Sequence, residues 1–440
     1  MKILVLNAGS SSQKSCLYEL EGDQLPDHPP TPRWQAQIDW THRSGMAELK
    51  VKTAAGQVLQ TEISASDREQ GITDLLATLW QGSTQVIDRP SDIDIIGHRV
   101  VHGGQTYRDS TWITAEVKGA IADLAALAPA HNPANLQGIE AIEAVLGTVQ
   151  QVAVFDTAFH AQIPDAAAIY PGPYEWVKQG IRRYGFHGIS HQYCMGRAAQ
   201  LLNRPVEQLR IITCHLGNGC SLAAIRNGQC IDTTMGFTPL DGLMMGTRSG
   251  AVDPGILLHL LRQGCSVADL DYQLNKASGL QGISGVSNDM RQVMAAVAKD
   301  GAKDGAKDGA EDGAKDGAKD GEAAGEQASR AQLALDIYVH RLRSSIGAML
   351  ASLGGLDVLV FTAGVGEHSA WVRAAACEAF QFLGLQLDLV RNAENPEDQL
   401  ISTPDSTVSV LVIHTEEDWA IARECWRLSA EKGSLASTDA

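Results

Sequence analysis

Apolar residues gather in two stretches of the chain that share one plan. Residues 2–19 form an apolar run, a bend of small residues at 8–12, and a return run that carries Lys14. Residues 211–228 again form an apolar run, a Gly-Asn-Gly bend and a second apolar run. This pattern predicts two β-hairpins. Because their bends hold no bulky side chains, backbone N–H groups are exposed there and can converge on an anion such as a phosphate.

The repetition of the hairpin changes the interpretation of each copy. A single Gly-Asn-Gly bend is typical of an ordinary hairpin that binds no ligand. Two bends of one design, about 210 positions apart, predict two related domains that face each other across a cleft and hold a phosphate between them. The length of 440 residues and the hydrophobic content of 44% suffice for two domains with a core each.

Three further apolar runs end in residues suited to ligand binding. The strand within 91–104 brings Arg99 to its end, where a guanidinium can hold a carboxylate or phosphate by two hydrogen bonds. A surface salt bridge is the alternative for this residue. The strand within 151–160 delivers Asp156 to a loop, and such strand ends face the ligand crevice in α/β sheets. The strand at 357–362 runs into Gly-Val-Gly and a helix, which is a nucleotide-binding arrangement.

Two loops and the last strand add charged groups. Residues 416–418, Glu-Glu-Asp, follow the last strand and offer the oxygen ligands that Mg²⁺ prefers. The glycine-rich loop at 235–250 contains one cation, Arg248, and long loops of this kind usually serve function. His187 lies in a compact loop, and taken alone it fits a structural histidine.

The histidine and cysteine spacings do not indicate a metal site or disulfides. His98 and His102 stand four residues apart, as do His187 and His191, but neither pair encloses the Glu of His-Glu-x-x-His. The eight cysteines form no Cys-x-x-Cys pair, so we interpret them as reduced thiols.

Residues 298–321 are six four-residue units, five of Ala-Lys-Asp-Gly and one of Ala-Glu-Asp-Gly. Each unit contains a glycine and has no apolar face, so it cannot offset the entropy of ordering. We therefore expect residues 298–327 to be a flexible insertion.

The overall charge bears on the partners. A net charge of −17 argues against a nucleic acid or an anionic membrane, because both demand basic patches. No apolar run reaches the roughly 20 residues that span a bilayer, and the first residues lack the pattern of a signal peptide. We expect a cytoplasmic protein with small-molecule substrates.

These parts together predict ATP-dependent phosphoryl transfer. The sequence has no Gly-x-x-x-x-Gly-Lys-Ser/Thr loop and no protein-kinase motifs, and the duplicated hairpin indicates the two-domain ATPase architecture of actin, sugar kinases and Hsp70. Apart from 298–327, nearly the whole chain resembles the acetate kinase family. The resemblance rests on Asn7-Ala-Gly-Ser-Ser-Ser, Gly97-His-Arg-Val-Val-His-Gly-Gly, His131-Asn-Pro, Val154-Phe-Asp-Thr-Ala-Phe-His, Tyr184-Gly-Phe-His-Gly, His215-Leu-Gly-Asn-Gly, the 235–250 loop and Phe361-Thr-Ala-Gly-Val-Gly-Glu.

The resemblance implies an α/β fold of two duplicated ATPase domains, with mixed five-stranded sheets flanked by helices around a cleft. An N-terminal lobe would contain residues 1–157 and about 416–440, and a nucleotide-binding lobe would contain residues 158–415. The implied reaction is the reversible conversion of ATP and acetate to ADP and acetyl phosphate. Mg²⁺ would be required, with Mn²⁺ as a substitute, and the enzyme would be a cytoplasmic homodimer.

The resemblance also assigns roles to individual residues. The implied catalytic residues are Asp156, His187 and Arg248, and the implied metal ligands are Asn7 and Glu417. The acetate would contact Arg99, Val101, Ala130, His131, Phe186 and Pro239. The ATP would contact Ser10, Ser12, Lys14, His215, Leu216, Gly217, Asn218, Gly219, Asp289, Met290, Arg291, Gly364, Val365, Gly366, Glu367 and His368.

Elementary chemistry supports two of these roles and leaves one open. The transferred phosphoryl group spreads negative charge over its oxygens, so hydrogen-bond donors and cations held in place stabilise it, and Arg248 and His187 can provide them. The resemblance implies that Asp156 acts as a proton donor or acceptor. Acetate, with a carboxyl pKa of about 4 to 5, is already ionised at pH 7, so positioning Mg²⁺ or Arg99 is an alternative role for Asp156.

Three positions depart from the family pattern, and alternative functions remain to be considered. Ala130 stands where the family usually has Leu, which would enlarge the pocket and makes a propionate-preferring kinase an alternative. Glu416 and His368 each stand where Asn is common, near the implied metal and nucleotide. A non-catalytic ATP-binding module and a sugar kinase of the same fold are two competing hypotheses. Arg99, Asp156, His187 and Arg248 argue against the first, and the apolar pocket argues against the second.

Overall fold

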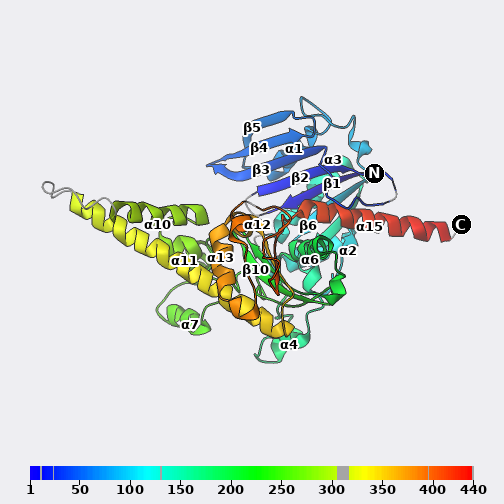
Figure 1. Ribbon diagram of the computed structural model, residues 1–440. Coiled ribbons are helices and arrows are strands. Elements are labelled where there is room, and N and C mark those ends of the chain that lie inside the picture. The colour runs from blue at the N-terminus through cyan, green and yellow to red at the C-terminus, as the bar shows by residue number, and fades with distance from the viewer. Residues whose placement is uncertain (10–11, 23, 129–130, 305–316, 395, 439–440) are drawn as a thin grey trace. The chain divides into compact units, whose positions relative to one another are not determined.

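The computed structural model describes residues 1–9, 12–22, 24–128, 131–304, 317–394 and 396–438. The chain divides into two compact units (Figure 1). Unit 1 contains Met1–Ala161, His187–Tyr193 and Glu416–Ala440, and unit 2 contains Gln162–Phe186 and Cys194–Thr415. None of the helices in the described ranges has the length and apolar character needed to cross a membrane.

Unit 1 is built on an eight-stranded sheet with the order β5-β4-β3-β2-β1-β6-β8-β7. The strand β1 is antiparallel to β2, with Asn7 paired to Lys14, and parallel to β6, which is parallel to β8. The strands are β1 (Lys2–Ala8), β2 (Ser12–Glu19), β3 (Trp34–Arg43), β4 (Met46–Thr53), β5 (Val58–Ser64), β6 (Ile95–Val100), β7 (Thr111–Trp112) and β8 (Gln150–Phe155).

Helices cover both faces of the centre of this sheet, which explains the continuous apolar run of β1. Leu4 and Leu6 belong to a buried cluster with residues of α1 (Arg68–Ala77) and α3 (Asn132–Leu146). The helix α15 (Glu417–Thr438) packs on β1 and β6. It lies so close that a Cβ at Gly97 would be 2.6 Å from Cys425 Sγ, so only glycine fits there. A further helix of unit 1 is α2 (Ala115–Asp123).

Unit 2 is built on a six-stranded sheet with the order β11-β10-β9-β12-β14-β13. Here β9 is antiparallel to β10 and parallel to β12, which is parallel to β14. The strands are β9 (Arg210–Leu216), β10 (Cys220–Arg226), β11 (Gln229–Thr233), β12 (Val358–Thr362), β13 (Gln399–Leu400) and β14 (Ser409–Val412).

The two sheets repeat one topology, which confirms the predicted hairpins and the predicted duplication. The order β3-β2-β1-β6-β8 in unit 1 matches β11-β10-β9-β12-β14 in unit 2, strand direction included. The sheets are wider than the five strands expected, because β4, β5 and β7 extend the first and β13 extends the second.

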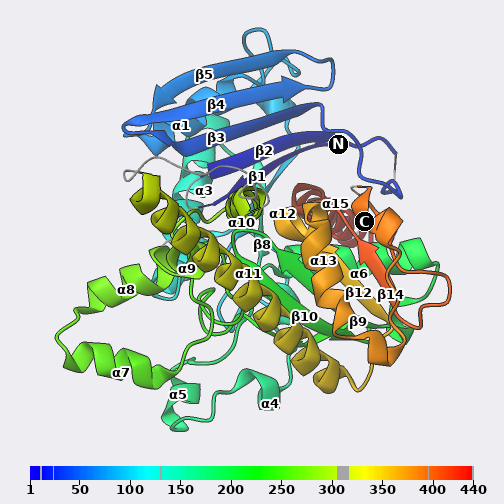
Figure 2. The same ribbon diagram turned by 60° about the vertical axis from the view of Figure 1, so that its left-hand side comes forward.

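The helices of unit 2 include a long helical hairpin. Figure 2 shows α11 running beside α10 and α9. The expected flexible insertion at 298–327 is helical at both flanks, through the end of α10 and the start of α11, and its centre at 305–316 lies outside the described residues. The helices are α4 (Asp165–Ala168), α5 (Glu175–Lys178), α6 (Gly188–Leu202, which begins in unit 1), α7 (Pro254–Arg262), α8 (Val267–Lys276), α9 (Gly279–Ser284), α10 (Met290–Asp304), α11 (Gly317–Leu353), α12 (Ala363–His368), α13 (Ala370–Glu378) and α14 (Leu389–Ala393).

The buried His98 makes the stability of unit 1 depend on pH. Burial lowers the pKa of His98 from 6.5 to about 4, and the hydrogen bond to Gln151, 2.6 Å from Nε2 to Oε1, only partly opposes this shift. The unfolded chain binds the proton more tightly, so this histidine stabilises the fold above pH 6.5 and loses that contribution as the pH falls toward 4.

We expect the free energy of unfolding to fall by about 2 kcal/mol between pH 7 and pH 5 through His98 alone. Urea unfolding at both pH values measures it, with His98→Asn as the variant that does not titrate. The difference in the free energy of unfolding between pH 7 and pH 5 should be smaller in the variant than in the parent. An equal difference in parent and variant would contradict the assignment.

Candidate functional site

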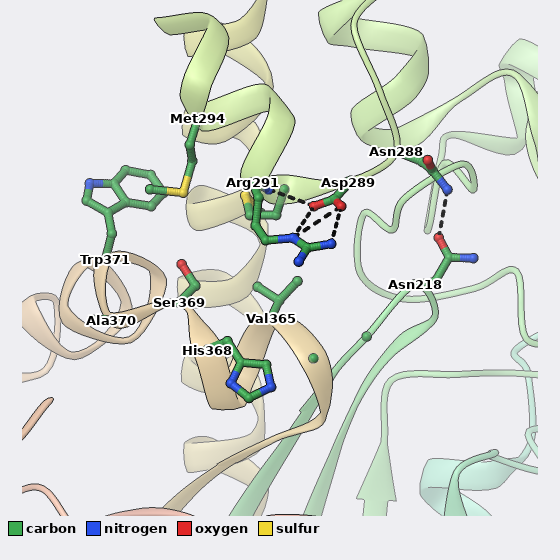
Figure 3. A pocket seen from close by; sticks show the side chains of 13 residues that line it. Asn218, Asn288, Asp289, Arg291, Met294, Val365, His368, Ser369, Ala370 and Trp371 are labelled. Atoms are coloured by element: carbon green, nitrogen blue, oxygen red, sulfur yellow. Dashed lines mark hydrogen bonds and ion pairs between the residues drawn. The ribbon is translucent and has the colours of Figure 1, made fainter. Parts of the chain in front are cut away.

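A cavity of about 810 Å³ in unit 2 collects three segments that are distant in sequence (Figure 3). They are the bend between β9 and β10, the start of α10 with the residues before it, and the α12–α13 segment. Figure 3 shows Asn218 and Asn288 at one end of the cavity and Met294 with Trp371 at the other. The lining residues are Gly217, Asn218, Asn288, Asp289, Met290, Arg291, Met294, Gly364, Val365, His368, Ser369, Ala370 and Trp371.

The bend between β9 and β10 is held in shape by backbone contacts. The N–H of Gly217 donates to the carbonyl of Gly219 at 3.0 Å, which closes the bend. The N–H of Gly246 donates to the carbonyl of Asn218 at 3.2 Å, and a Cβ at Gly246 would be 2.2 Å from Asn218 Oδ1. Asn288 Nδ2 also donates to Asn218 Oδ1, at 3.4 Å. The exposed Asn218 therefore has a fixed backbone at the edge of the cavity.

Arg291 and Asp289 form a charged pair on the cavity wall. Two nitrogens of Arg291 donate to the two carboxylate oxygens of Asp289, at 3.1 and 2.6 Å. These hydrogen bonds lower the pKa of the Asp289 carboxyl. The side chain of Arg291 is 88% exposed, so the pair holds a guanidinium at the open side of the cavity.

The turn after β12 is fixed from inside the unit by Glu367. Its carboxylate accepts hydrogen bonds from the N–H of Ala363 at 2.8 Å and of Thr415 at 3.3 Å, and lies 2.6 Å from His414 Nδ1. Burial raises the pKa of Glu367, but the hydrogen bonds outweigh it and the pKa lies below its ordinary value. Ala363 has a φ of +63°, a left-handed conformation that the hydrogen bonds to the Glu367 carboxylate maintain.

A buried arginine supports the other end of the same turn. The guanidinium of Arg373 donates to the carbonyls of Gly366 and Glu367 at 2.9 and 2.7 Å, and to Asn392 Oδ1 at 2.7 Å. Burial lowers the pKa of Arg373 to about 10. The hydrogen bonds of Glu367 and Arg373 to the backbone of this turn give both side chains a positioning role.

Unit 1 contains a buried ion pair with unused hydrogen-bonding atoms. Arg99 NH2 lies 2.9 Å from Asp156 Oδ2, which also accepts a hydrogen bond from the N–H of His187 at 2.9 Å. Within the described part of the chain, Arg99 Nε and Asp156 Oδ1 are buried and have no hydrogen-bond partner. Burial raises the pKa of Asp156, but Arg99 outweighs it and the carboxyl stays ionised at neutral pH. A donor and an acceptor left open in this way are suited to a ligand.

A second group of polar side chains lies at the start of α15. Asn7 Nδ2 donates to Asp418 Oδ1 at 3.0 Å and to Glu417 Oε2 at 3.3 Å. Across the described ranges, no three His, Cys, Asp or Glu side chains converge as a ready metal site. An ion bound here would have few protein ligands. That agrees with Mg²⁺, which usually takes one or two carboxylates and completes its shell with water and phosphate oxygens.

The glycine-rich loop of unit 2 is folded tightly on itself. Arg248 NH1 donates to the carbonyl of Pro239 at 3.2 Å, and burial lowers the pKa of Arg248. Gly242 and Gly250 have positive φ values and leave no room for a Cβ. The loop therefore presents its single arginine from a rigid backbone.

The structure groups many, but not all, of the residues singled out in the sequence. Eight line the cavity: Gly217, Asn218, Asp289, Met290, Arg291, Gly364, Val365 and His368. Five others stand beside the lining residues in sequence without lining the cavity themselves. Of these, His215 and Leu216 are buried in β9, Gly366 is buried in α12, and Glu367 is turned inward. The fifth is Gly219.

The remaining residues lie elsewhere. Ser12 and the exposed Lys14 lie on β2 of unit 1. Val101 is buried, and His131 stands at the start of α3. Phe186, in unit 2, is 1% exposed. Ser10 and Ala130 lie outside the described residues.

Sequence reasoning missed five residues of the cavity: Asn288, Met294, Ser369, Ala370 and Trp371. All of them flank motifs that were recognised. Met294 follows Met290 by four positions, so the helical period of α10 places both on one face. No comparable signal marks Trp371, which is 38% exposed and resembles an ordinary surface residue.

Comparison with known proteins gives consistent matches along the chain. A sequence profile of the acetokinase family matches residues 2–310 and 316–423. The acetate kinase of Trichormus variabilis is 63% identical over 429 residues, which cover 97% of this chain and 99% of that protein. Among solved structures, acetate kinase of Porphyromonas gingivalis matches with a TM-score of 0.82 and 38% identity, over 96% of this chain and 98% of that one. A propionate kinase of Francisella tularensis matches with a TM-score of 0.80 and 35% identity, at the same coverages.

Proposed function

The chain belongs to the acetokinase family, and from this membership we propose how its residues carry out phosphoryl transfer. Its function is that of an acetate kinase, which transfers the γ-phosphoryl group of ATP to acetate and gives acetyl phosphate and ADP reversibly. The observation that carries this conclusion is the 63% identity to an acetate kinase over 97% of the chain. The relatives at this level of identity are acetate kinases, so a preference for propionate is not favoured.

The cavity of unit 2 is the proposed ATP site. Its apolar end, with Met294 and Trp371, suits the flat face of a nucleobase (Figure 3). Its other end has the Gly217–Asn218 bend and Gly364, where the backbone can approach phosphate oxygens closely. Arg291, whose guanidinium is paired with Asp289, lies at the open side and offers N–H donors to a phosphate. Glu367 acts on the nucleotide only by holding the turn, because its carboxylate is occupied by the backbone and His414.

Arg99 is the proposed binding residue for the acetate carboxylate. Its Nε is a buried donor with no hydrogen-bond partner in the described part of the chain, while NH2 is held by Asp156. A carboxylate that accepts from Nε would offset the cost of this unpaired donor. The proposed apolar wall around the methyl group consists of Val101, Ala130, His131, Phe186 and Pro239.

Arg248 and His187 are the proposed stabilising groups for the transferred phosphoryl group. Arg248 is partly buried and held by the carbonyl of Pro239, so its charge is fixed before the reaction begins. His187 has a φ of +57°, and its N–H donates to Asp156. Asp156 is thus bonded to both Arg99 and His187, and its pKa is lowered. We therefore assign it a positioning role and not the transfer of a proton.

Mg²⁺ is the proposed metal, with Asn7 and Glu417 as its protein ligands. The amide nitrogen of Asn7 points to Glu417 and Asp418, which leaves its carbonyl oxygen for an ion. Asp156 Oδ1 is a further buried oxygen that no group in the described ranges occupies. All of these are hard oxygen ligands of the kind Mg²⁺ and Mn²⁺ prefer. When bound, the ion would offset the charge of the ATP phosphates.

A homodimer formed through α7 and α8 is the proposed assembly. None of the nine residues of α7 is buried in unit 2, although the helix carries Ile256, Leu258 and Leu261 at 48, 53 and 41% exposure. On α8, Val267 and Tyr272 are 76 and 62% exposed. An exposed apolar group of this size favours a protein partner. A cytoplasmic location is proposed because ATP is the substrate and all eight cysteines are free thiols.

We expect Arg99→Ala to lower kcat/KM for acetate by about 100- to 1,000-fold, because one fixed charged donor is lost. The measurement is an ATP-dependent hydroxamate trap with acetate, propionate and butyrate side by side. Acetate should exceed propionate by about tenfold, the effect of one methylene in a fitted pocket. Arg89→Ala, which removes an exposed ion pair in the same unit, is the control and should match the parent. Turnover of none of the acids, or full activity of Arg99→Ala, would refute the proposal.

Glu417→Gln should weaken the binding of the metal at least about tenfold, because a charged oxygen ligand becomes neutral. Electron paramagnetic resonance of Mn²⁺, titrated with protein and ADP, measures binding without turnover. Glu424→Gln lies on the same helix but its carboxylate is held by Arg427, so this control should bind Mn²⁺ as the parent does. Equal affinities in all three proteins would exclude Glu417 as a ligand.

Leu258→Glu should shift the protein from dimer to monomer, because burial of a charge in an apolar interface is costly. Sedimentation velocity distinguishes the chain mass of 47.0 kDa from twice that value. Leu333→Glu places the same charge on α11 at a residue of similar exposure, 52%, and should leave the dimer intact. If the parent is monomeric, or if Leu258→Glu remains a dimer, α7 is not the interface.

A further inference from the structure

The side chain of Arg183 joins two segments of unit 2 that lead to proposed reaction residues. Its NH1 donates to three successive backbone carbonyls, those of Thr233, Thr234 and Met235, at 2.9, 2.9 and 3.0 Å. These carbonyls stand at the end of β11, where the strand gives way to the glycine-rich loop. One nitrogen, with two hydrogens, thus lies within hydrogen-bond distance of all three carbonyl oxygens, so one of its hydrogens is shared.

The backbone around Arg183 joins the same two segments. The N–H groups of Tyr184 and Gly185 donate to the carbonyl of Gly236, at 3.0 and 3.4 Å. Phe186 and His187 follow directly in the chain. The segment that ends in these two residues is therefore bonded along its length to the first residues of the loop.

A tyrosine and an aspartate hold the guanidinium in place. Arg183 NH2 lies 3.5 Å from Asp241 Oδ2, and the guanidinium carbon lies 5.7 Å from the centre of the Tyr170 ring. The hydroxyl of Tyr170 accepts a hydrogen bond from the N–H of Phe237 at 2.9 Å. Both partners of Arg183 thus contact the loop as well, Asp241 as a member of it and Tyr170 through Phe237.

Close packing within the glycine-rich loop connects the segment bonded to Arg183 with Arg248. Gly242 lies against Thr234, where an added Cβ would be 2.8 Å from the carbonyl oxygen. Gly250 in turn lies against Leu243, where a Cβ would be 2.3 Å from the carbonyl oxygen. The N–H of Met245 donates to the carbonyl of Arg248 at 3.1 Å. We therefore expect a shift at Thr234 to displace Arg248 as well.

We propose that Arg183 is a positioning residue for phosphoryl transfer, which sets Arg248 and Pro239 on one side and Phe186 on the other. The inference rests on the proposed function, because it assigns Arg183 no role apart from these residues. The proposal gives Arg183 no contact with either substrate. Its effect falls on the transition state, since the cavity proposed for ATP contains none of the residues that it contacts.

Lysine cannot replace this arginine fully. A guanidinium donates in several directions from one rigid plane, whereas an ammonium is a single point on a flexible stem. Arg183→Lys should keep the charge beside Asp241 and lose part of the carbonyl bonding. Arg183→Ala should lose all of it and leave a space that a free guanidinium ion fits.

The test compares kcat and KM of Arg183→Ala and Arg183→Lys with the parent. We expect kcat to fall about 10- to 100-fold in Arg183→Ala, the cost of a small misplacement of catalytic groups, and less in Arg183→Lys. KM for ATP should stay within about twofold, because binding shared by ground state and transition state is untouched. Guanidinium ion at millimolar concentration should restore part of kcat to Arg183→Ala and change nothing in the parent.

Arg210→Ala is the matched control. Arg210 also makes several hydrogen bonds in unit 2, to Asp357 and to the carbonyl of Gly354, but at the start of β9. The Arg210→Ala variant should have a lower thermal midpoint than the parent and an unchanged kcat. The inference is overturned if Arg183→Ala keeps the parent kcat, or if its KM for ATP rises as much as kcat falls. It is also overturned if Arg183→Ala and Arg210→Ala each lose kcat in proportion to the fall of their thermal midpoints. An inactive parent would instead refute the proposed function.

Discussion

Parallel pairing of the three central strands is the constraint on which both units depend. In unit 1, β1, β6 and β8 run in one direction, so their carboxyl ends share one edge of the sheet. In unit 2, β9, β12 and β14 do the same. The bend of each hairpin falls at that edge as well, because β1 and β9 end where their antiparallel partners begin. One rule of strand direction thus brings Arg99 and Asp156 together, and likewise the Gly217 bend and the α12 turn.

The buried charges at these edges differ in whether their hydrogen bonds are complete. Glu367 and Arg373 use their polar atoms on the backbone of the turn and on Asn392 and His414. Arg99 and Asp156 form an ion pair, yet each keeps a buried atom without a hydrogen-bond partner in the described ranges. An unpaired buried atom costs stability, and a protein keeps it where a ligand completes the bonding. Glu367 and Arg373 therefore support the site, whereas Arg99 and Asp156 keep atoms that can bind a ligand.

The sequence predicted the parts of this arrangement that local pattern encodes. Both hairpins follow from apolar runs around small-residue bends, and the duplicated sheets follow from their repetition. The extra strands β4 and β5 were not predicted, although Ala47, Leu49 and Val51 alternate in burial as a half-covered strand requires. The inward turn of Glu367 could not be predicted, because its partners His414 and Thr415 are 47 and 48 positions away. Trp371 was missed because nothing local separates a cavity wall from ordinary surface.

The helix α10 has one end at the cavity and the other end far from it, so substitutions at its two ends have different effects on the nucleotide site. The first two turns of α10 supply Met290, Arg291 and Met294 to the cavity wall. The last residue of the helix, Asp304, lies about 20 Å from Met290 along the helix axis. The Ala-Lys-Asp-Gly units occupy that distant end. A change at that end of α10 therefore lies far from the nucleotide wall. The same distance makes the end of α10, near Asp304, a suitable point for grafting a fluorophore tag or a tether onto the enzyme.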